Sequence, residues 1–238
     1  TSGMSILTQS AELVRRSCSR LLPQDCLLCG AASGTTLLCP ACTTDLPRLP
    51  ATRCPRCALP TPGGSVCGRC LAAPPHYDAT LAVYCYAFPI DKLVQAFKYG
   101  HRLALGAWFG SRLAELARGF HADLIVPMPL HRLRLRERGF NQALELARAV
   151  SRCSRIPIDA RTCTRIRQTA TQADLPWRER AGNVRGAFHC ASDLTGRRLV
   201  LVDDVMTTGA SLNELARTVK LHGALEVTLL TLARALPA

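Results

Sequence analysis

The sequence predicts an α/β fold, with helices flanking a parallel sheet, preceded by a small cysteine-rich module. Two observations carry this prediction. From residue 76 onward, apolar strand-like runs alternate with segments of helical periodicity. Before that point, eight cysteines fall in four Cys-x2-Cys pairs, a spacing typical of zinc ribbons. We therefore expect a tag remnant and N-terminal helix over residues 1–25, a double zinc-ribbon repeat over 26–73 and a larger domain over 76–238.

The N-terminal residues predict a short helix and no export signal. Thr1, Ser2 and Gly3 precede Met4 and resemble an expression remnant, and residues 6–22 have the pattern of a basic amphipathic helix. No stretch approaches the ~20 consecutive apolar residues that span a bilayer. We therefore expect a cytoplasmic protein without a membrane partner.

The paired cysteines form an internal repeat, in which each of the first four recurs 28 positions later. Within each repeat the two pairs are separated by nine residues, which suits a tetrahedral site of four thiolates. Disulfides or redox pairs would not require this even spacing. We predict structural zinc on two sequential sets, although the ligands could also interleave between the repeats. The predicted metal ligands are Cys26, Cys29, Cys39, Cys42, Cys54, Cys57, Cys67 and Cys70.

Five further cysteines lack partners at metal spacing, and we expect all five to be small buried hydrophobes. They are Cys18, Cys85, Cys153, Cys163 and Cys190.

The sequence of the larger domain predicts alternating strands and helices. The expected strands are 78–88, 123–126, 186–189, a run beginning at 199 and 226–233, and the expected helices are 90–99, 103–120, one ending near Arg152 and one ending near His222. Residues 164–185 are polar, basic and weakly periodic. A long loop of this kind in a compact domain is usually functional or disordered, which favours a lid over a site.

Charge is concentrated rather than spread. The formal net charge is +13, and two zinc ions on eight thiolates would change it to 13 − 8 + 4 = +9. Residues 128–190 carry 13 arginines and 5 acids, a net +8, whereas residues 191–238 balance at five and five. A focused basic segment attracts a polyanion such as pyrophosphate or a nucleic-acid backbone.

The stretch from Leu199 to Ser211 carries the clearest functional pattern. Four apolar residues of a buried strand run into two adjacent carboxylates, Asp203 and Asp204, where we expect the strand to stop. A turn of hydroxyl-bearing residues and glycine then opens a helix, whose N-terminal N–H groups and dipole suit a phosphate. The carboxylates suit vicinal sugar hydroxyls or a divalent cation. The pattern therefore predicts a phosphorylated sugar as ligand.

A second basic pattern lies upstream. Arginines alternate along residues 132–138 after an expected strand end, which places several guanidinium groups close together. Guanidinium groups bind phosphate oxygens bidentately, so a pyrophosphate is a natural ligand. The same segment could equally be a solvated charged loop.

These motifs together resemble the ComF family, a zinc-ribbon module followed by a type I phosphoribosyltransferase domain. Residues 199–211 look like the thirteen-residue signature for 5-phosphoribosyl-1-pyrophosphate (PRPP). The other matching features are the cysteine repeats and residues 98–100, 126–131, 136–142 and 178–188. Met128 and Ser211 depart slightly from the family pattern, where valine and threonine are usual, and preserve the chemistry.

The resemblance implies a type I phosphoribosyltransferase-like parallel sheet and a PRPP site that works with Mg²⁺. Asp203 and Asp204 would contact the ribose hydroxyls as the catalytic acids. The 5′-phosphate would be held by Thr207, Thr208, Gly209, Ala210 and Ser211, and the leaving pyrophosphate by Lys98, Arg134, Arg136 and Arg138. The family also links this chain to DNA uptake in natural transformation.

Three functions remain compatible with the sequence. The first is an enzyme that transfers phosphoribosyl from PRPP to an acceptor that the residues do not reveal. The second is a competence factor that binds single-stranded DNA on its basic face, with PRPP as a regulatory ligand; its weakness is an aromatic content of only 5% for base stacking. The third is a zinc scaffold for a helicase or another DNA-uptake partner.

Overall fold

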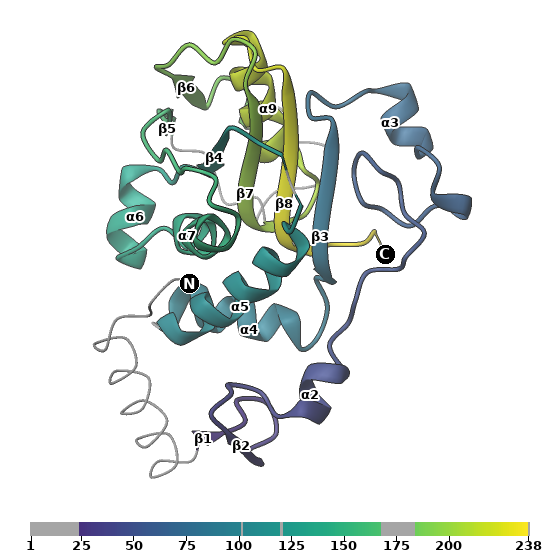
Figure 1. Cartoon of the computed structure of the whole chain (residues 1–238), viewed down its shortest axis with the longest axis vertical. Coiled ribbons are helices and arrows are strands. Elements are labelled where there is room, and N and C mark those ends of the chain that lie inside the picture. Colours follow the sequence, from purple (N-terminus) through teal and green to yellow (C-terminus); the bar gives the residue numbers. More distant parts are fainter. Residues whose placement is uncertain (1–23, 101, 120, 168–183, 238) are drawn as a thin grey trace, which may run out of the picture. The chain divides into compact units, whose positions relative to one another are not determined.

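The computed structural model describes residues 24–100, 102–119, 121–167 and 184–237 (Figure 1). The helix expected over residues 6–22, Cys18 and most of the lid expected over 164–185 lie outside these ranges. The chain divides into two compact units, Thr1–Leu46 and Pro47–Ala238. The four-cysteine sets therefore fall in different units, since the second repeat begins at Cys54.

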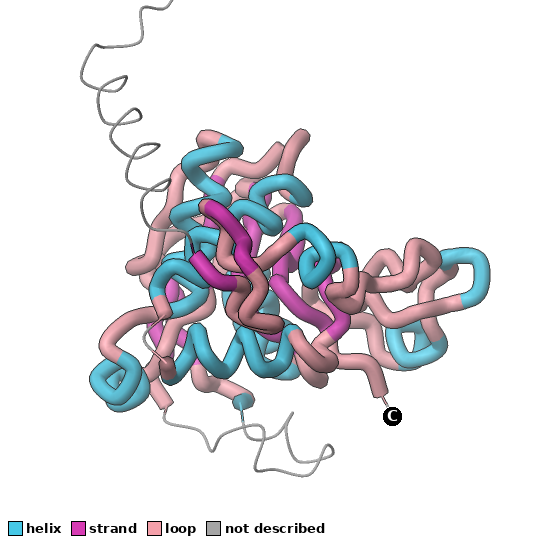
Figure 2. The backbone as a smooth tube through the Cα atoms, turned by 90° about the horizontal axis from the view of Figure 1, so that it is seen from below, coloured by secondary structure: helices cyan, strands magenta, loops and turns pink. Residues whose placement is uncertain are grey.

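The first unit is a small ribbon. Strand β1 (Gln24–Asp25) pairs antiparallel with β2 (Ala32–Gly34), and helix α2 (Pro40–Thr44) follows. Cys39 is the N-cap of α2, where its sulfur accepts the backbone N–H of Cys42 at 3.5 Å. The second unit begins with a comparable ribbon containing η1 (Pro62–Gly64) and α3 (Gly68–Ala72). Six of the eight paired cysteines lie in loops and turns. Figure 2 distinguishes the helices, strands and loops of the chain by colour.

The centre of the second unit is the predicted parallel sheet, with strand order β3-β8-β7-β4. Its strands are β3 (Ala79–Cys85), β4 (Leu124–Pro127), β7 (Arg198–Met206) and β8 (Glu226–Arg234). All three strand pairs are parallel. A separate antiparallel pair joins β5 (Cys163–Arg165) to β6 (Phe188–Cys190).

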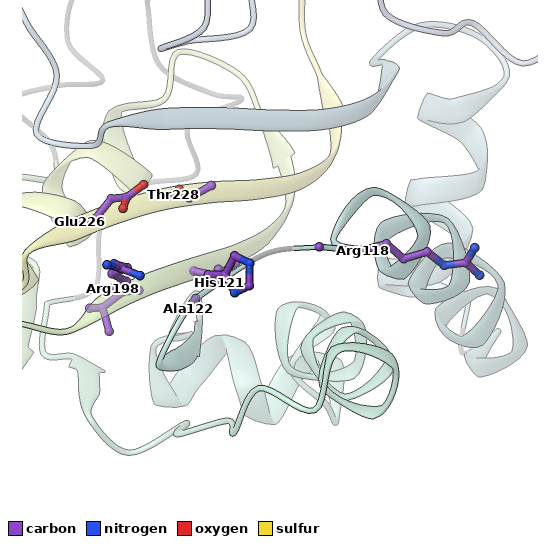
Figure 3. A pocket seen from close by; sticks show the side chains of 9 residues that line it. Arg118, His121, Ala122, Arg198, Glu226 and Thr228 are labelled. Carbon is purple, nitrogen blue, oxygen red and sulfur yellow. The ribbon is translucent and has the colours of Figure 1, made fainter.

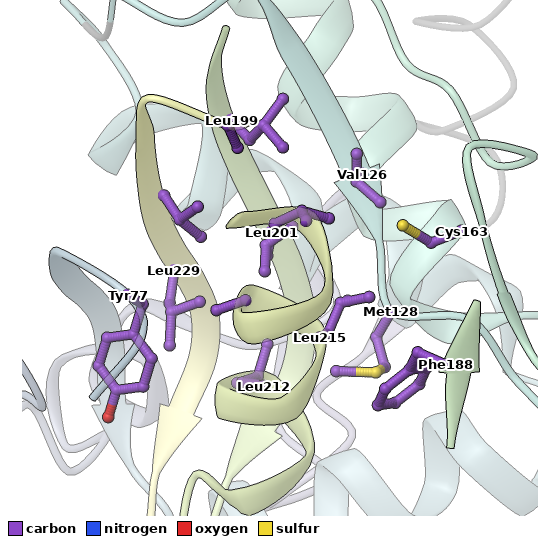
Figure 4. Packing of buried hydrophobic residues seen from close by; sticks show 14 of the residues in the cluster. Tyr77, Val126, Met128, Cys163, Phe188, Leu199, Leu201, Leu212, Leu215 and Leu229 are labelled. Carbon is purple, nitrogen blue, oxygen red and sulfur yellow. The ribbon is translucent and has the colours of Figure 1, made fainter. Parts of the chain in front are cut away.

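Helices cover both faces of this sheet. The elements are α4 (Ile90–Tyr99), α5 (Leu103–Leu116), α6 (Arg132–Arg138), α7 (Gln142–Ser154) and α9 (Ala210–Leu221). Leu212 and Leu215 of α9 pack with Leu201 and Leu229 of the sheet (Figure 4). The intervening residues of β7, such as Val202, are buried but lie outside that cluster, because side chains alternate between the faces of a strand. Helices α5 and α7, which also contact the strands, cover this opposite face.

Three elements differ from what the sequence suggested. Strand β7 does not stop at the acids but continues to Met206, because β8 pairs with it as far as Arg234. Residues 132–138 form helix α6 instead of a loop: the His131 side chain caps its N-terminus, and Gly139 ends it at φ +77°. Helix α5 also ends at Leu116, earlier than expected.

The expectation for the five unpaired cysteines is partly wrong. Cys163 and Cys190 are buried opposite each other in the β5–β6 pair, as predicted for small hydrophobes. Cys153 is exposed near the end of α7, and Cys85, at the end of β3, is only half-buried. Periodicity could not place these two, because each lies at the last turn or residue of its element.

Candidate functional site

The eight paired cysteines form two sequential four-cysteine clusters, so the repeats do not interleave. The sulfur atoms within each cluster all lie within 4.8 Å of one another. Four thiolates at this spacing are the donor set of a structural tetrahedral zinc site, which fits a zinc ion in each cluster. The first cluster is Cys26, Cys29, Cys39 and Cys42, and the second is Cys54, Cys57, Cys67 and Cys70.

Backbone N–H groups lower the pKa of one thiol in each cluster, which favours metal binding. Burial opposes ionisation of Cys26, but backbone N–H groups at Cys39 and Cys29 lower its pKa to about 6. The same balance in the second cluster lowers the pKa of Cys54 to about 7. Because the thiolate is the metal ligand, each cluster has one cysteine whose lowered pKa favours metal binding near neutral pH.

The carboxyl end of β7 brings together two acids and a lysine from a distant helix. The Nζ of Lys98, in the last turn of α4, lies 2.9 Å from a carboxylate oxygen of Asp204. The neighbouring Asp203 accepts the backbone N–H of Asp204 at 2.8 Å. Burial alone would lower the pKa of Lys98, but Asp204 outweighs it and raises that pKa. Asp204 is therefore held by a charged lysine.

Asp203 lies in a less favourable environment for a charge. Burial and the adjacent Asp204 carboxylate raise its pKa to about 7, although Lys98 and Arg165 oppose the rise. Two adjacent carboxyl groups with different partners are a common arrangement where one must ionise easily and the other must gain a proton. The pair can therefore accept two hydroxyl protons in hydrogen bonds while carrying less than two full negative charges.

The predicted phosphate loop lies directly after this pair. Gly209 has φ +83° and is the N-cap of α9, a helix of 12 residues. The conformation favours glycine, and a Cβ atom at this position would lie 2.6 Å from Cε of Met206, so that flexible side chain would have to move. The hydroxyl of Thr208 accepts the backbone N–H of Ala210 at 3.1 Å. The chain thus turns abruptly from β7 into the positive end of a helix dipole.

The arginines of α6 are not gathered as the alternating pattern suggested. On a helix, residues four apart share a face and residues two apart lie about 200° apart. Arg134 and Arg138 are half-buried, whereas Arg136 is exposed. Arg138 donates to the hydroxyl of Tyr99 at 3.0 Å and lies over its ring at 5.1 Å, which places it beside the end of α4 that carries Lys98.

Three residues that the sequence did not single out for the site contribute to it. Arg165 of β5 is near enough to lower the pKa of Asp203. Glu214 of α9 accepts the backbone N–H of Gly186 at 2.7 Å and so ties the helix to the segment before β6. Arg234, at the end of β8, is fully buried behind the phosphate loop. No local pattern marks them, because each is distant in sequence from the group it contacts.

A cavity of about 770 Å³ opens between α6, α7 and β5. Arginine and apolar side chains share its lining, among them Arg165, Leu135 and Phe140. Arg165, which lines this cavity, also interacts electrostatically with Asp203 of the acid pair. The size and mixed lining of the cavity suit a planar polar molecule.

A second cavity, of about 340 Å³, lies at the opposite edge of the sheet (Figure 3). Arg198, Glu226 and His121 line it and are exposed, and Arg118 lies apart from them in the close-up. Ligands of open parallel sheets bind beyond the carboxyl ends of the strands, and this cavity lies at the amino ends. The carboxyl edge is therefore the candidate site.

Comparison with protein families matches both parts of the chain. Residues 18–71 match a double zinc ribbon domain, and residues 141–236 match a phosphoribosyl transferase domain. The cysteine clusters are therefore zinc-ribbon sites, and the sheet and its flanking helices form a phosphoribosyltransferase-like domain. None of the helices in the described ranges combines the length and apolarity needed to cross a membrane.

Individual relatives cover most of the chain. It is 36% identical over 227 residues to the DNA utilization protein YhgH of Escherichia coli K12, covering 90% of this chain and 99% of that protein. It is 34% identical over 183 residues to competence protein F of Haemophilus influenzae, covering 71% of this chain and 78% of that protein. Among solved structures, a purine phosphoribosyltransferase of Pyrococcus horikoshii is 24% identical over 53% of this chain and 70% of that one, with a TM-score of 0.34.

Proposed function

We propose a PRPP site on the premise that this chain belongs to the ComF family, with competence protein F and the DNA utilization protein YhgH. The protein binds PRPP together with Mg²⁺ at the carboxyl edge of the sheet and transfers its phosphoribosyl group to an acceptor. The observation that carries the proposal is the Lys98–Asp204 pair next to a glycine-capped helix N-terminus. The carboxylates, the lysine and the helix N-terminus that would bind a phosphorylated sugar thus meet at the end of one strand.

Each group has a role that follows from its charge. Asp203 and Asp204 accept hydrogen bonds from the ribose hydroxyls, and backbone N–H groups of residues 207–211 hold the 5′-phosphate. Lys98, freed from Asp204 by the incoming sugar, balances the pyrophosphate together with Arg134 and Arg138. Arg136 is exposed and would contact the pyrophosphate only at the outer edge of the site.

The reaction breaks the bond between C1 of the ribose and the pyrophosphate oxygen and forms a bond between C1 and the acceptor. The bonding pair of the broken bond leaves on pyrophosphate. Mg²⁺, which binds carboxylates and substrate phosphates together, would supply further positive charge for the leaving group. The chain needs no nucleophile of its own, because positioning and charge stabilisation supply most of the rate gain in such transfers.

The acceptor lies in the cavity of about 770 Å³, where Arg165 interacts electrostatically with Asp203 and Phe140 offers an aromatic face. The same lining supports a second candidate function. Arginines and an aromatic ring beside a net +8 segment also suit a single-stranded DNA backbone and base. In that case PRPP would be a regulatory ligand, and DNA would be bound but not modified. A helicase or other uptake partner on the zinc ribbons remains the third expectation.

Calorimetric titration of PRPP with Mg²⁺ tests the proposal. The double variant Asp203→Asn/Asp204→Asn should lose binding, whereas Glu226→Gln, which removes an exposed acid at the amino end of β8, should bind as the wild type does. Repeating the titration with a single-stranded oligonucleotide shows whether DNA and PRPP affect each other. Absence of PRPP binding to folded, zinc-loaded wild type would overturn the enzyme proposal and favour a DNA-binding module.

A further inference from the structure

The second cysteine cluster is packed behind the predicted phosphate loop. Cys54, Cys57 and Cys70 share a buried cluster with Met206, which precedes the loop, and with Tyr77. The Tyr77 hydroxyl lies 3.6 Å from the position that a Cβ atom of residue 209 would take. The ribbon and the loop are therefore in one packed core, although the second cluster and the loop are far apart in sequence.

One side chain connects the two parts by hydrogen bonds. The Nε of Arg234 donates to the carbonyl oxygen of Cys57 at 2.9 Å. Its Nη1 donates to the carbonyl of Met206 at 2.9 Å, to that of Ala235 at 2.8 Å and to that of Thr207. Three of these four carbonyls, those of Met206, Thr207 and Cys57, belong to the start of the loop or to a metal knuckle.

These bonds orient the loop. A peptide group is planar and trans, so its N–H points away from its carbonyl oxygen. With the carbonyl oxygens of Met206 and Thr207 turned towards Arg234, the N–H groups of Thr207 and Thr208 point away from it. Those N–H groups are among the donors that the proposed function assigns to the 5′-phosphate. Arg234 can therefore set the direction of phosphate-binding groups without touching the phosphate.

The charge of Arg234 needs a counter-charge. Its side chain is 0% exposed, and within the described ranges it forms no ion pair with a carboxylate. A zinc ion with four thiolates carries a net charge of +2 − 4 = −2. The second cluster, loaded with zinc, would thus supply negative charge beside Arg234, whereas the metal-free thiols would supply less of it and leave the guanidinium less well compensated.

We propose that Arg234 is a positioning residue for the phosphate loop and that it couples phosphate binding at this loop to zinc in the second cluster. The inference rests on the proposed function, since it assigns PRPP to residues 207–211. Loss of zinc reduces the counter-charge, releases Arg234 and loosens the loop, and bound PRPP in turn retains the zinc. Because coupling between two binding sites is reciprocal, zinc should change the affinity for PRPP by the same factor by which PRPP changes the affinity for zinc.

The first test replaces Arg234 with an apolar side chain of similar length. Arg234→Met, with zinc content and circular dichroism unchanged, should bind Mg²⁺–PRPP at least tenfold more weakly, and amide exchange at residues 207–209 should be faster. The matched control is Arg198→Met, which removes an exposed arginine from the opposite end of the sheet. Wild-type affinity and wild-type exchange in Arg234→Met would overturn the inference. If the variant does not fold, Arg234→Lys is used instead, because it keeps the positive charge but lacks the several donors of the guanidinium. It should show the same changes in PRPP affinity and amide exchange, but smaller ones.

The second test needs no change at Arg234. Zinc release to a chelator is followed in Cys39→Ser, which disrupts the first cluster and leaves the second as the zinc site. PRPP should slow that release at least tenfold in this variant. In Cys67→Ser, where only the first cluster remains, PRPP should have no effect on release. Equal release rates with and without PRPP in both variants would overturn the coupling.

The two proposals fail separately. If wild type does not bind PRPP, the proposed function fails, and the amide exchange of residues 207–209 in Arg234→Met still decides whether Arg234 holds the loop. If wild type binds PRPP and neither Arg234→Met nor zinc removal changes the affinity, the proposed function stands and the inference is refuted.

Discussion

Replacing Asp203 by asparagine should stabilise the folded protein at pH 8 and remove part of the pH dependence of its stability. In the folded protein, burial and the carboxylate of Asp204 raise the pKa of Asp203 from its ordinary 3.8 to about 7. Asparagine has nearly the same shape and never ionises. The substitution therefore removes an unfavourable charge and leaves the ion pair between Lys98 and Asp204 in place.

The size and sign follow from proton linkage. Between pH 4 and 7 the folded protein keeps a proton on Asp203 that the unfolded chain has lost, so the free energy of unfolding falls as the pH rises. The full difference is roughly 4 kcal/mol, at about 1.36 kcal/mol per pH unit. From pH 5 to 8 the contribution of this group falls by roughly 3 kcal/mol and then levels off. In a chain of this size that corresponds to roughly 6–12 °C in Tm.

Urea unfolding of wild type and Asp203→Asn at pH 5, 6, 7 and 8 measures this difference. Zinc binding also depends on pH, but it affects both proteins equally and cancels when their free energies of unfolding are subtracted. Glu226→Gln, at the far end of the sheet, should follow the wild type. Parallel pH profiles of wild type and Asp203→Asn would refute the reasoning, because they would mean that Asp203 ionises normally in the folded protein.

Two further predictions concern the loop and its support. Gly209→Ala should lower PRPP affinity and cost about 1–2 kcal/mol of stability because of its φ of +83°, in addition to the cost of displacing Met206. The control Gly196→Ala, with φ +73° and open space around it, should show only the backbone cost in urea unfolding. Equal PRPP affinity of the two variants would contradict the role of Gly209. Glu214→Ala should cost about 1–3 kcal/mol and speed amide exchange at Gly186, because it removes the buried carboxylate that accepts that N–H. Unchanged exchange would show that this bond does not hold the segment before β6.

The sequence predicted most of the fold because its signals are local. The helix over residues 90–99 appears with the bounds that periodicity indicated. The cysteine spacing correctly indicated two sequential clusters. The predictions that failed depended on partners elsewhere in the chain. Strand β7 runs past Asp203 because β8 continues beside it, and residues 132–138 became a helix once His131 and Gly139 supplied its ends.

The candidate site divides in the same way. Asp203, Asp204 and the glycine turn after them were readable because a single strand–turn–helix segment carries them all. The pairing of Lys98 with Asp204 required a helix and a strand that are distant in sequence to meet. The different exposure of Arg134 and Arg136 depended on residues 132–138 forming a helix. The assigned roles in PRPP binding remain predictions.

The sequence by itself determined which chemical groups this protein has and the order of its elements: thiolates at metal spacing, then a parallel sheet whose one strand ends in acids and a phosphate-type turn. Only the tertiary structure decided what surrounds those groups. It buried Asp203 enough to raise its pKa, and it placed Arg234 between the second ribbon and the loop. Both outcomes depend on desolvation and on contacts between residues far apart in the chain, and neither leaves a periodic pattern in the sequence.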